Sequence, residues 1–259
     1  MKNQIWNRRG ARLLLVILAS WKLALLSLHA QTPEPGGSLF GRENYIEYRV
    51  GNLPLILTSG HGGDILPSEI ADRTWGSRGT DRNTRQLTEA IAAEIFERTG
   101  RHPHVVISHL RRLKLDPNRE IEEAAQGDPL AEQAWTEFHD FIRTARAAAA
   151  EEFGFGFLMD IHGHGHDVQR VELGYALSAS QLNQSVATLE QPGWGWDSSL
   201  RTLLLRRPGV GFPELLRGPR SLGHLFNLGG IPTWPSPEFP SPDNEPFFSG
   251  GYITRNHTS

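Results

Sequence analysis

The chain has 259 residues, a formal net charge of −3, a sequence pI near 6.4 and no cysteine. Its arginines are scattered among acidic residues instead of forming a basic stripe, which argues against a nucleic-acid partner. Without thiols, disulfides and thiolate ligands are excluded, so any metal must be held by His, Asp, Glu or water. A hydrophobic content of 38% is enough for one globular domain with a single core.

The amino terminus has the pattern of an export signal. Basic residues precede an apolar run over 13–28, and Ala30 precedes a stretch rich in proline and glycine. We therefore expect a signal peptide over 1–30, a linker over 31–44 and a domain over 45–259, in a periplasmic or secreted protein. The alternative is a membrane anchor formed by an uncleaved leader, since Leu28 is a poor residue for the third position before cleavage.

Apolar spacing and turn residues predict strands that alternate with helices. In chain order we expect a strand over 51–59, a helix from 80 or 81 to 98, a strand over 104–110, a helix over 128–152 and a strand over 155–161. This order predicts a single α/β domain with a mainly parallel or mixed sheet flanked by helices. Ligands of such sheets gather at the carboxyl ends of the strands.

Less regular elements follow the third strand. We expect a further strand over 171–177 and short helices over 181–188 and 198–206. Beyond Gly230 the chain is rich in proline, serine and glycine and predicts irregular structure.

Two histidines, His61 and His162, lie in glycine-flanked loops directly after predicted strands. Neutral imidazoles are good zinc ligands, and a catalytic zinc site takes three protein ligands and leaves one position open. Asp64 is the natural third ligand and Glu69 the alternative. Because both loops fall on one edge of the sheet, the sequence predicts a metal site there.

Further residues beside these loops suit a pocket. Asp160 could orient the histidine loop, and we expect His164 and His166 to line the pocket. Near the exit of the second strand, Arg112, Asn118 and Arg119 are candidates for binding a substrate carboxylate, which a guanidinium grips with paired hydrogen bonds.

Four segments in order resemble the N-formylglutamate amidohydrolase family. They are Ser-Gly-His-Gly-Gly at 59–63, Lys-Leu-Asp-Pro-Asn-Arg at 114–119, Asp-Ile-His-Gly-His at 160–164 and Phe-Ser-Gly-Gly-Tyr-Ile-Thr-Arg at 248–255. The resemblance covers roughly residues 54–255 and implies a fold related to the zinc carboxypeptidases.

The resemblance implies that a bound Zn²⁺ activates water against the amide bond of a small N-acyl amino acid. On the matching positions, His61 and His162 become the histidine ligands, and Asp64 replaces the glutamate of the His-x-x-Glu pair. Arg119 and Arg255 would hold the substrate carboxylate. A carboxypeptidase or cell-wall amidase acting on a peptide carboxylate is the nearest alternative activity.

Hydrolases of this kind also need a carboxylate general base. In the family it comes from a strand after the last of the four segments, whereas this sequence stops at Ser259. Glu172 and Glu238 are the candidates to replace it. A chain shortened at its carboxyl end, or an inactive carboxylate-binding relative, are the alternatives.

Overall fold

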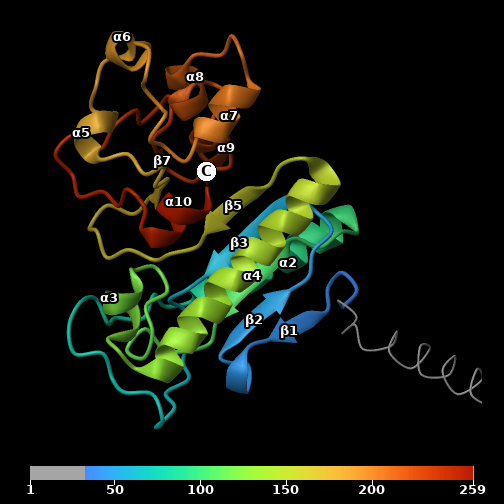
Figure 1. Cartoon of the computed structure of the whole chain (residues 1–259). Coiled ribbons are helices and arrows are strands. Elements are labelled where there is room, and N and C mark those ends of the chain that lie inside the picture. The colour runs from blue at the N-terminus through green and yellow to red at the C-terminus, as the bar shows by residue number, and fades with distance from the viewer. Residues whose placement is uncertain (1–32, 259) are drawn as a thin grey trace, which may run out of the picture. The chain divides into compact units, whose positions relative to one another are not determined.

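Five strands form a mixed sheet in the order β1-β2-β4-β3-β5 (Figure 1). Their bounds are Ser38–Phe40 (β1), Ile46–Arg49 (β2), Leu55–Ser59 (β3), His104–Ser108 (β4) and Phe157–Asp160 (β5). The three central strands β4, β3 and β5 are parallel, and β2 and β1 extend the sheet in antiparallel fashion. The expected α/β architecture with a mixed sheet is confirmed.

The structure, a computed structural model, describes residues 33–258. The expected export signal over 1–30 lies outside these residues. Within the described residues, those from 35 to 258 belong to one compact unit. In the described part of the chain, no helix has the length and apolar character to cross a membrane.

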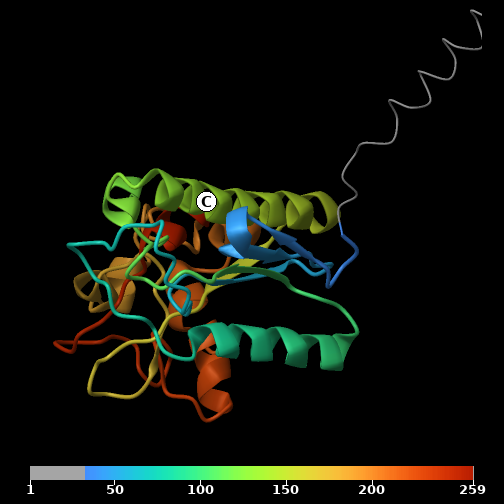
Figure 2. The same cartoon turned by 90° about the horizontal axis from the view of Figure 1, so that it is seen from below.

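Two long helices cover opposite faces of the sheet, as Figure 2 shows: α2 (Thr84–Thr99) and α4 (Pro129–Phe153). Alternate residues of a strand point to opposite faces. Leu57 and Val105 accordingly pack with the α2 side, and Ile56 and Val106 with the α4 side. The carboxyl ends of β3 and β5 are thereby held between two layers.

The long helix α4 begins where the sequence predicts. The Asp128 carboxylate accepts hydrogen bonds from the backbone nitrogens of Leu130 and Ala131, and Pro129 occupies the first turn. Phe138 and Ile142 on its inner face are fully buried. Aspartate capping and one apolar stripe therefore fix both the start of α4 and its packing.

Helix α2 begins later than predicted. The sequence predicts a start at residue 80 or 81, but Thr84 is the first residue of the helix, and Asn83, in the left-handed region at φ 65°, precedes it. The backbone nitrogen of Asp81 instead donates to the carbonyl of His61, 3.1 Å away. Asp81 is thus tied to the loop after β3.

The segment expected as a linker contributes to the sheet. Residues 38–40 form β1, and Arg42–Asn44 form a short 3-10 helix, η1, before β2. Ser38 pairs with Arg49 in the register of β1 and β2. β1 and β2 were not predicted, because no α-helix separates them in the sequence as α-helices separate β3, β4 and β5.

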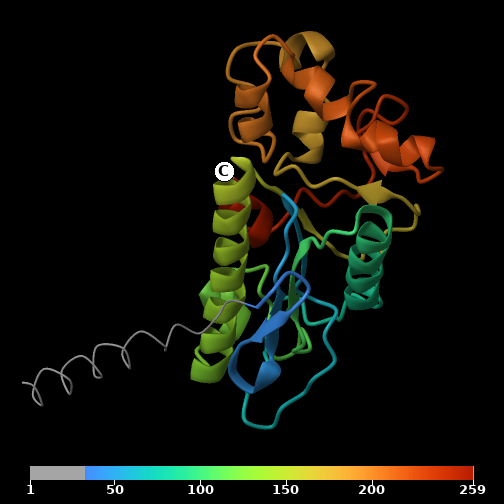
Figure 3. The ribbon, with the colours of Figure 1, turned by 90° about the vertical axis from the view of Figure 1, so that its right-hand side faces the viewer.

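The second half of the chain forms a lobe of short helices beside the sheet (Figure 3). The lobe and its connections contain β6 (Val171–Glu172), α5 (Ala179–Leu182), α6 (Val186–Leu189), α7 (Arg201–Arg206), α8 (Phe212–Arg217), α9 (Leu222–Leu228) and β7 (Thr233–Trp234). The expected strand over 171–177 is only two residues long, and the expected helix over 181–188 is divided into α5 and α6. A separate apolar cluster, which includes Leu182, Phe212 and Leu216, packs this lobe.

Two further helices flank the carboxyl edge of the sheet: α3 (Ile121–Ala125) and α10 (Tyr252–His257). Ile253 of α10 is fully buried in the same core as α4. The carboxyl-terminal segment is therefore packed against the main core of the fold.

Truncation of Phe138 should destabilise the fold strongly. Its ring is fully buried between α4 and the sheet, so Phe138→Ala leaves a cavity and should lower the free energy of unfolding by about 3–5 kcal/mol. Phe40 is half exposed at the sheet edge, and Phe40→Ala should cost less than about 1 kcal/mol. Urea unfolding of both variants measures the difference; equal losses would contradict this packing.

Candidate metal centre

His61 lies in a loop that only glycine can build. A Cβ on Gly62 would lie 2.5 Å from the backbone nitrogen of Arg85, and a Cβ on Gly63 would lie 2.4 Å from the carbonyl group of His109. Both obstacles are backbone atoms and cannot give way. This close packing buries His61 at the end of β3, with 1% of the residue exposed.

His61, Asp81 and His162 form a group that could bind a metal ion. Oδ2 of Asp81 lies 3.3 Å from Nδ1 of His61 and 3.0 Å from Nδ1 of His162. The same oxygen accepts a hydrogen bond from the backbone nitrogen of Gly163. Three potential ligand atoms from three segments of the chain therefore converge on one point.

Each histidine is backed by a second carboxylate. Nε2 of His61 lies 2.6 Å from Oδ1 of Asp116, and Nε2 of His162 lies 2.6 Å from Oδ2 of Asp160. Because a carboxylate accepts, each Nε2 is the nitrogen that donates a proton, which leaves Nδ1 as the nitrogen that faces Asp81 and that could bind a metal ion. Carboxylate-bound imidazoles of this kind are typical of metal ligands, since the second hydrogen bond fixes the ring and raises its basicity.

The site is electrostatically suited to a cation. Burial opposes a charge on His162, but Asp160 and Asp81 outweigh it and raise the pKa of His162 to about 10. Burial likewise opposes ionisation of Asp81, yet its hydrogen bonds to His162 and His61 hold its pKa well below the usual range. A positive charge between the two Nδ1 atoms and Asp81 is thus strongly favoured. A metal ion at this position would supply that charge in place of a proton.

Access to the centre differs between the two histidines. The side chain of His162 is 29% exposed, whereas that of His61 is 2% exposed. A ligand from solvent can therefore reach the cluster from the His162 side.

Asp64 and Glu69, the ligands expected from the sequence, lie elsewhere. The Asp64 side chain is 73% exposed and pairs with Arg85 at 3.0 Å. Glu69 accepts a hydrogen bond from the Tyr45 hydroxyl. Neither belongs to the group of possible metal ligands, in which Asp81 is the carboxylate beside the two histidines.

The expected substrate-binding residues also separate. Arg112 donates to Asp116 at 2.8 Å and lies 3.5 Å from Asp81, so it neutralises the carboxylates of the centre itself. Arg119 donates to its neighbour Glu123 at 3.2 Å. Arg255 is exposed on α10, and its guanidinium forms no hydrogen bond or ion pair within the described residues.

Asn118 contacts the centre directly. Its Nδ2 lies 3.1 Å from Nε2 of His162, and its backbone nitrogen donates to Oδ1 of Asp116 at 3.1 Å. The preceding residue, Pro117, accepts a hydrogen bond from Nε2 of His139 at 3.0 Å, and His139 stacks on His257 of α10. The loop over 116–118 therefore contacts both His61 and His162, and residues outside the site support this loop.

The two nominated general bases are both engaged. Oε1 of Glu172 lies 2.8 Å from Nδ1 of His166 and 2.9 Å from Arg170, and Oε2 accepts from the backbone nitrogen of Phe248. Glu172 also forms a second group of possible metal ligands with His164 and His166. The Arg170 guanidinium already neutralises Glu172 there, and Nε2 of His164 donates to the carbonyl of Arg170.

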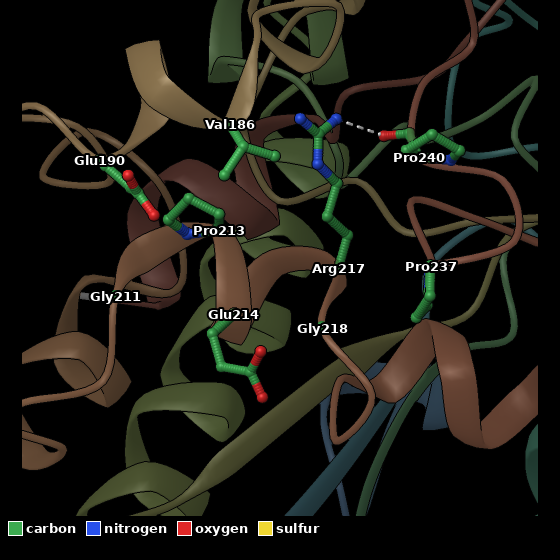
Figure 4. Close-up of a pocket in the computed structure, with 9 residues that line it drawn as sticks. All are labelled: Val186, Glu190, Gly211, Pro213, Glu214, Arg217, Gly218, Pro237 and Pro240. Atoms are coloured by element: carbon green, nitrogen blue, oxygen red, sulfur yellow. Dashed lines mark hydrogen bonds between the residues drawn. The ribbon is translucent and has the colours of Figure 1, made fainter.

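Glu238 lies in the lobe of short helices, where it pairs with Nδ1 of His224 at 2.8 Å. A hollow of about 390 Å³ in the same lobe is lined by residues of α6 and α8 and their neighbours (Figure 4). Arg217 there donates to the carbonyl of Pro240, a contact drawn in Figure 4. None of the residues lining this hollow belongs to the His61 cluster.

Asp81 and Asp116 are the residues that sequence reasoning missed. Asp81 lies at the start of the predicted helix over 80 or 81 to 98, and Asp116 lies in the segment over 114–119, so neither is close to His61 or His162 in the sequence. No protein-family model, curated protein or solved structure matches the chain.

The His139–His257 pair predicts a loss of stability in acid. Burial, together with His257, lowers the pKa of His139 to about 3, and burial, together with Arg146 and Arg143, lowers that of His257 to about 4. An unfolded histidine titrates near pH 6.5, so between about pH 6.5 and 4 the unfolded chain binds protons that the folded chain does not. The free energy of unfolding of the metal-free protein should therefore fall as pH falls through this window.

His139→Gln removes one of these two titrating groups. The dependence of the free energy of unfolding on pH should therefore become shallower by about 1.4 kcal/mol per pH unit, which corresponds to one proton fewer taken up on unfolding. Urea unfolding at several pH values between 7 and 4 measures the slope for both proteins. A variant whose slope equals that of the wild type would refute the assignment.

Proposed function

We propose that the chain is a zinc-dependent amidohydrolase that cleaves the amide bond of a small N-acyl amino acid, of the N-formylglutamate kind. The observation that carries the proposal is the convergence of His61 Nδ1, His162 Nδ1 and Asp81 Oδ2, with a carboxylate behind each imidazole. Two histidines and one carboxylate with an open position are a donor set of catalytic zinc sites. The sheet flanked by α2 and α4 is compatible with the zinc-carboxypeptidase-like fold that belongs to this proposal.

A zinc ion at this site would polarise the substrate carbonyl and lower the pKa of a bound water. The chain's own residues prepare the place for it. Asp116 and Asp160 orient the two rings, and Arg112 balances part of the negative charge of Asp116 and Asp81. The exposed side of His162 is where substrate enters.

Arg255 and Arg119 are the proposed partners of the substrate carboxylate. The exposure of Arg255 favours this role, because its guanidinium has no polar partner among the described residues and is available to a ligand. Arg119 would have to share its guanidinium with Glu123. Arg112 is less suited to bind the substrate carboxylate, because Asp116 and Asp81 already pair with its guanidinium.

His166 is the best candidate for the proton acceptor. Glu172 holds Nδ1 of His166 at 2.8 Å, and Phe248 stacks on the ring at 4.6 Å between centroids. The carboxylate fixes the proton on Nδ1, so the lone pair on Nε2 is available, and Nε2 has no hydrogen-bond partner within the described residues. Glu172 would thus orient the base that follows His162 by four residues in the same loop, and Glu238 would have no part.

The proposal predicts one tightly bound zinc ion per chain. His61→Ala, His162→Ala and Asp81→Ala should each abolish stoichiometric binding, because each removes a ligand atom. Asp64→Ala is the matched control and should bind like the wild type, since its carboxylate is exposed and pairs with Arg85. Calorimetric titration with zinc measures this; a wild type that binds none, or loss in Asp64→Ala alone, would contradict the ligand set.

Turnover should depend on His166. With zinc bound, His166→Gln should lower kcat on N-formyl-glutamate by about 10²–10⁴-fold without changing the amount of zinc, because general base catalysis contributes that much. Glu238→Gln should retain wild-type kcat. An active His166→Gln variant would exclude the histidine as the base.

Capture of a carboxylate ligand without turnover is the second candidate function. It is favoured by one observation: both nominated carboxylate bases, Glu172 and Glu238, are held in ion pairs. A zinc-loaded protein that binds N-acyl amino acids but hydrolyses none of a panel, including short peptides, would establish it. Hydrolysis of peptides alone would instead favour a carboxypeptidase or cell-wall amidase.

A further inference from the structure

The carboxyl-terminal segment over 251–257 packs on the loop over 116–118, which contacts both His61 and His162. We propose that this segment is a positioning element of the metal centre, which holds Asn118 against His162 and so sets the affinity of the site for metal. The inference rests on the proposed function in one respect, namely that His61, Asp81 and His162 bind zinc.

Asn118 joins the segment to the centre. Its Oδ1 accepts a hydrogen bond from the backbone nitrogen of Ile253 at 2.9 Å, and its backbone carbonyl accepts one from Tyr252 at 3.3 Å. On its other side, Nδ2 lies 3.1 Å from Nε2 of His162, in packing contact with the ring and not hydrogen bonded to it, because Asp160 accepts the proton of that nitrogen. Because Asn118 is buried, its amide cannot turn away from the His162 ring without losing the bond to Ile253.

Gly251 permits this close approach. A Cβ at this position would lie 2.5–2.6 Å from Nδ2, Oδ1 and Cγ of Asn118. The short amide is fixed by Ile253 and has little freedom to yield, so the added carbon would displace it from His162. The glycine is therefore needed for the contact between the segment and the centre.

A second attachment supports the same loop. Nε2 of His257 lies 2.8 Å from Nδ1 of His139, and Nε2 of His139 donates to the carbonyl of Pro117 at 3.0 Å. Pro117 lies between Asn118 and Asp116, the residue that holds His61. Both ends of the segment thus act on the residues that orient the two ligand rings.

Zinc titration of Gly251→Ala tests the proposal, with Gly211→Ala as the matched control. A Cβ on Gly211, in the lobe of short helices, would meet only Cδ of Pro213 at 3.7 Å, an ordinary contact. The dissociation constant for zinc should rise at least ten-fold in Gly251→Ala, as expected when a partner of a ligand histidine is disturbed. It should stay within two-fold of the wild type in Gly211→Ala.

Circular dichroism and thermal unfolding establish that the variants are folded during the titration. If Gly251→Ala does not fold, Asn118→Ala makes the same test by creating space in place of a clash, and the same loss of affinity is expected. Wild-type affinity in either folded variant would overturn the proposal while leaving the proposed function intact. The proposal would also be overturned if neither variant folds while Gly211→Ala does. The segment would then be needed for the stability of the whole fold and not specifically for the metal centre.

A wild type that binds no zinc would instead refute the proposed function. In that case the nitrogen chemical shifts of the His162 ring, compared between wild type and Gly251→Ala, still test the positioning role. A change at His162 is expected, and identical shifts would contradict it.

Discussion

The hydrogen bond between Nε2 of His61 and Oδ1 of Asp116 is the interaction on which the centre depends. It fixes the orientation of a buried imidazole, so that Nδ1 faces Asp81. It also ties the loop after β3 to the loop after β4, and Asn118 extends this link to His162. Without it, His61 could turn and the three potential ligand atoms would not converge.

This arrangement has an energetic cost that a cation offsets. Asp81, Asp116 and Asp160 lie within hydrogen-bond distance of two imidazoles in a largely buried region. Buried carboxylates are costly unless they are paired. Arg112 pairs with two of them, and the raised pKa of His162 indicates that the site still attracts positive charge. A divalent ion is the cation that fits two nitrogen lone pairs and a carboxylate together.

The sheet and the two long helices could be predicted because their causes are local. Asp128 and Pro129 determine the start of α4, and the runs of apolar residues before His61 and His162 determine β3 and β5. The positions of the two histidines follow directly, since parallel strands end at the same edge. The identity of the metal, the substrate and the export signal stay predictions.

The position of Asp81 beside the two histidines could not be predicted, because it depends on contacts between residues that are distant in the sequence. Asp64 is close to His61 in sequence, but the tight packing of Gly62 and Gly63 leaves its side chain in solvent beside Arg85. Asp81 reaches the histidines only because the start of α2 is folded back onto the loop of His61. The contact between Asn118 and α10 could not be predicted either, because more than a hundred residues separate them in the chain.

Anomalous diffraction from crystals grown with zinc would test the central claim most directly. One strong peak is expected at about 2.0–2.2 Å from Nδ1 of His61, Nδ1 of His162 and a carboxylate oxygen of Asp81. Asp116 and Asp160 should then still accept from the two Nε2 atoms. A peak beside Asp64 or Glu69, or no peak between the two histidines, would contradict it.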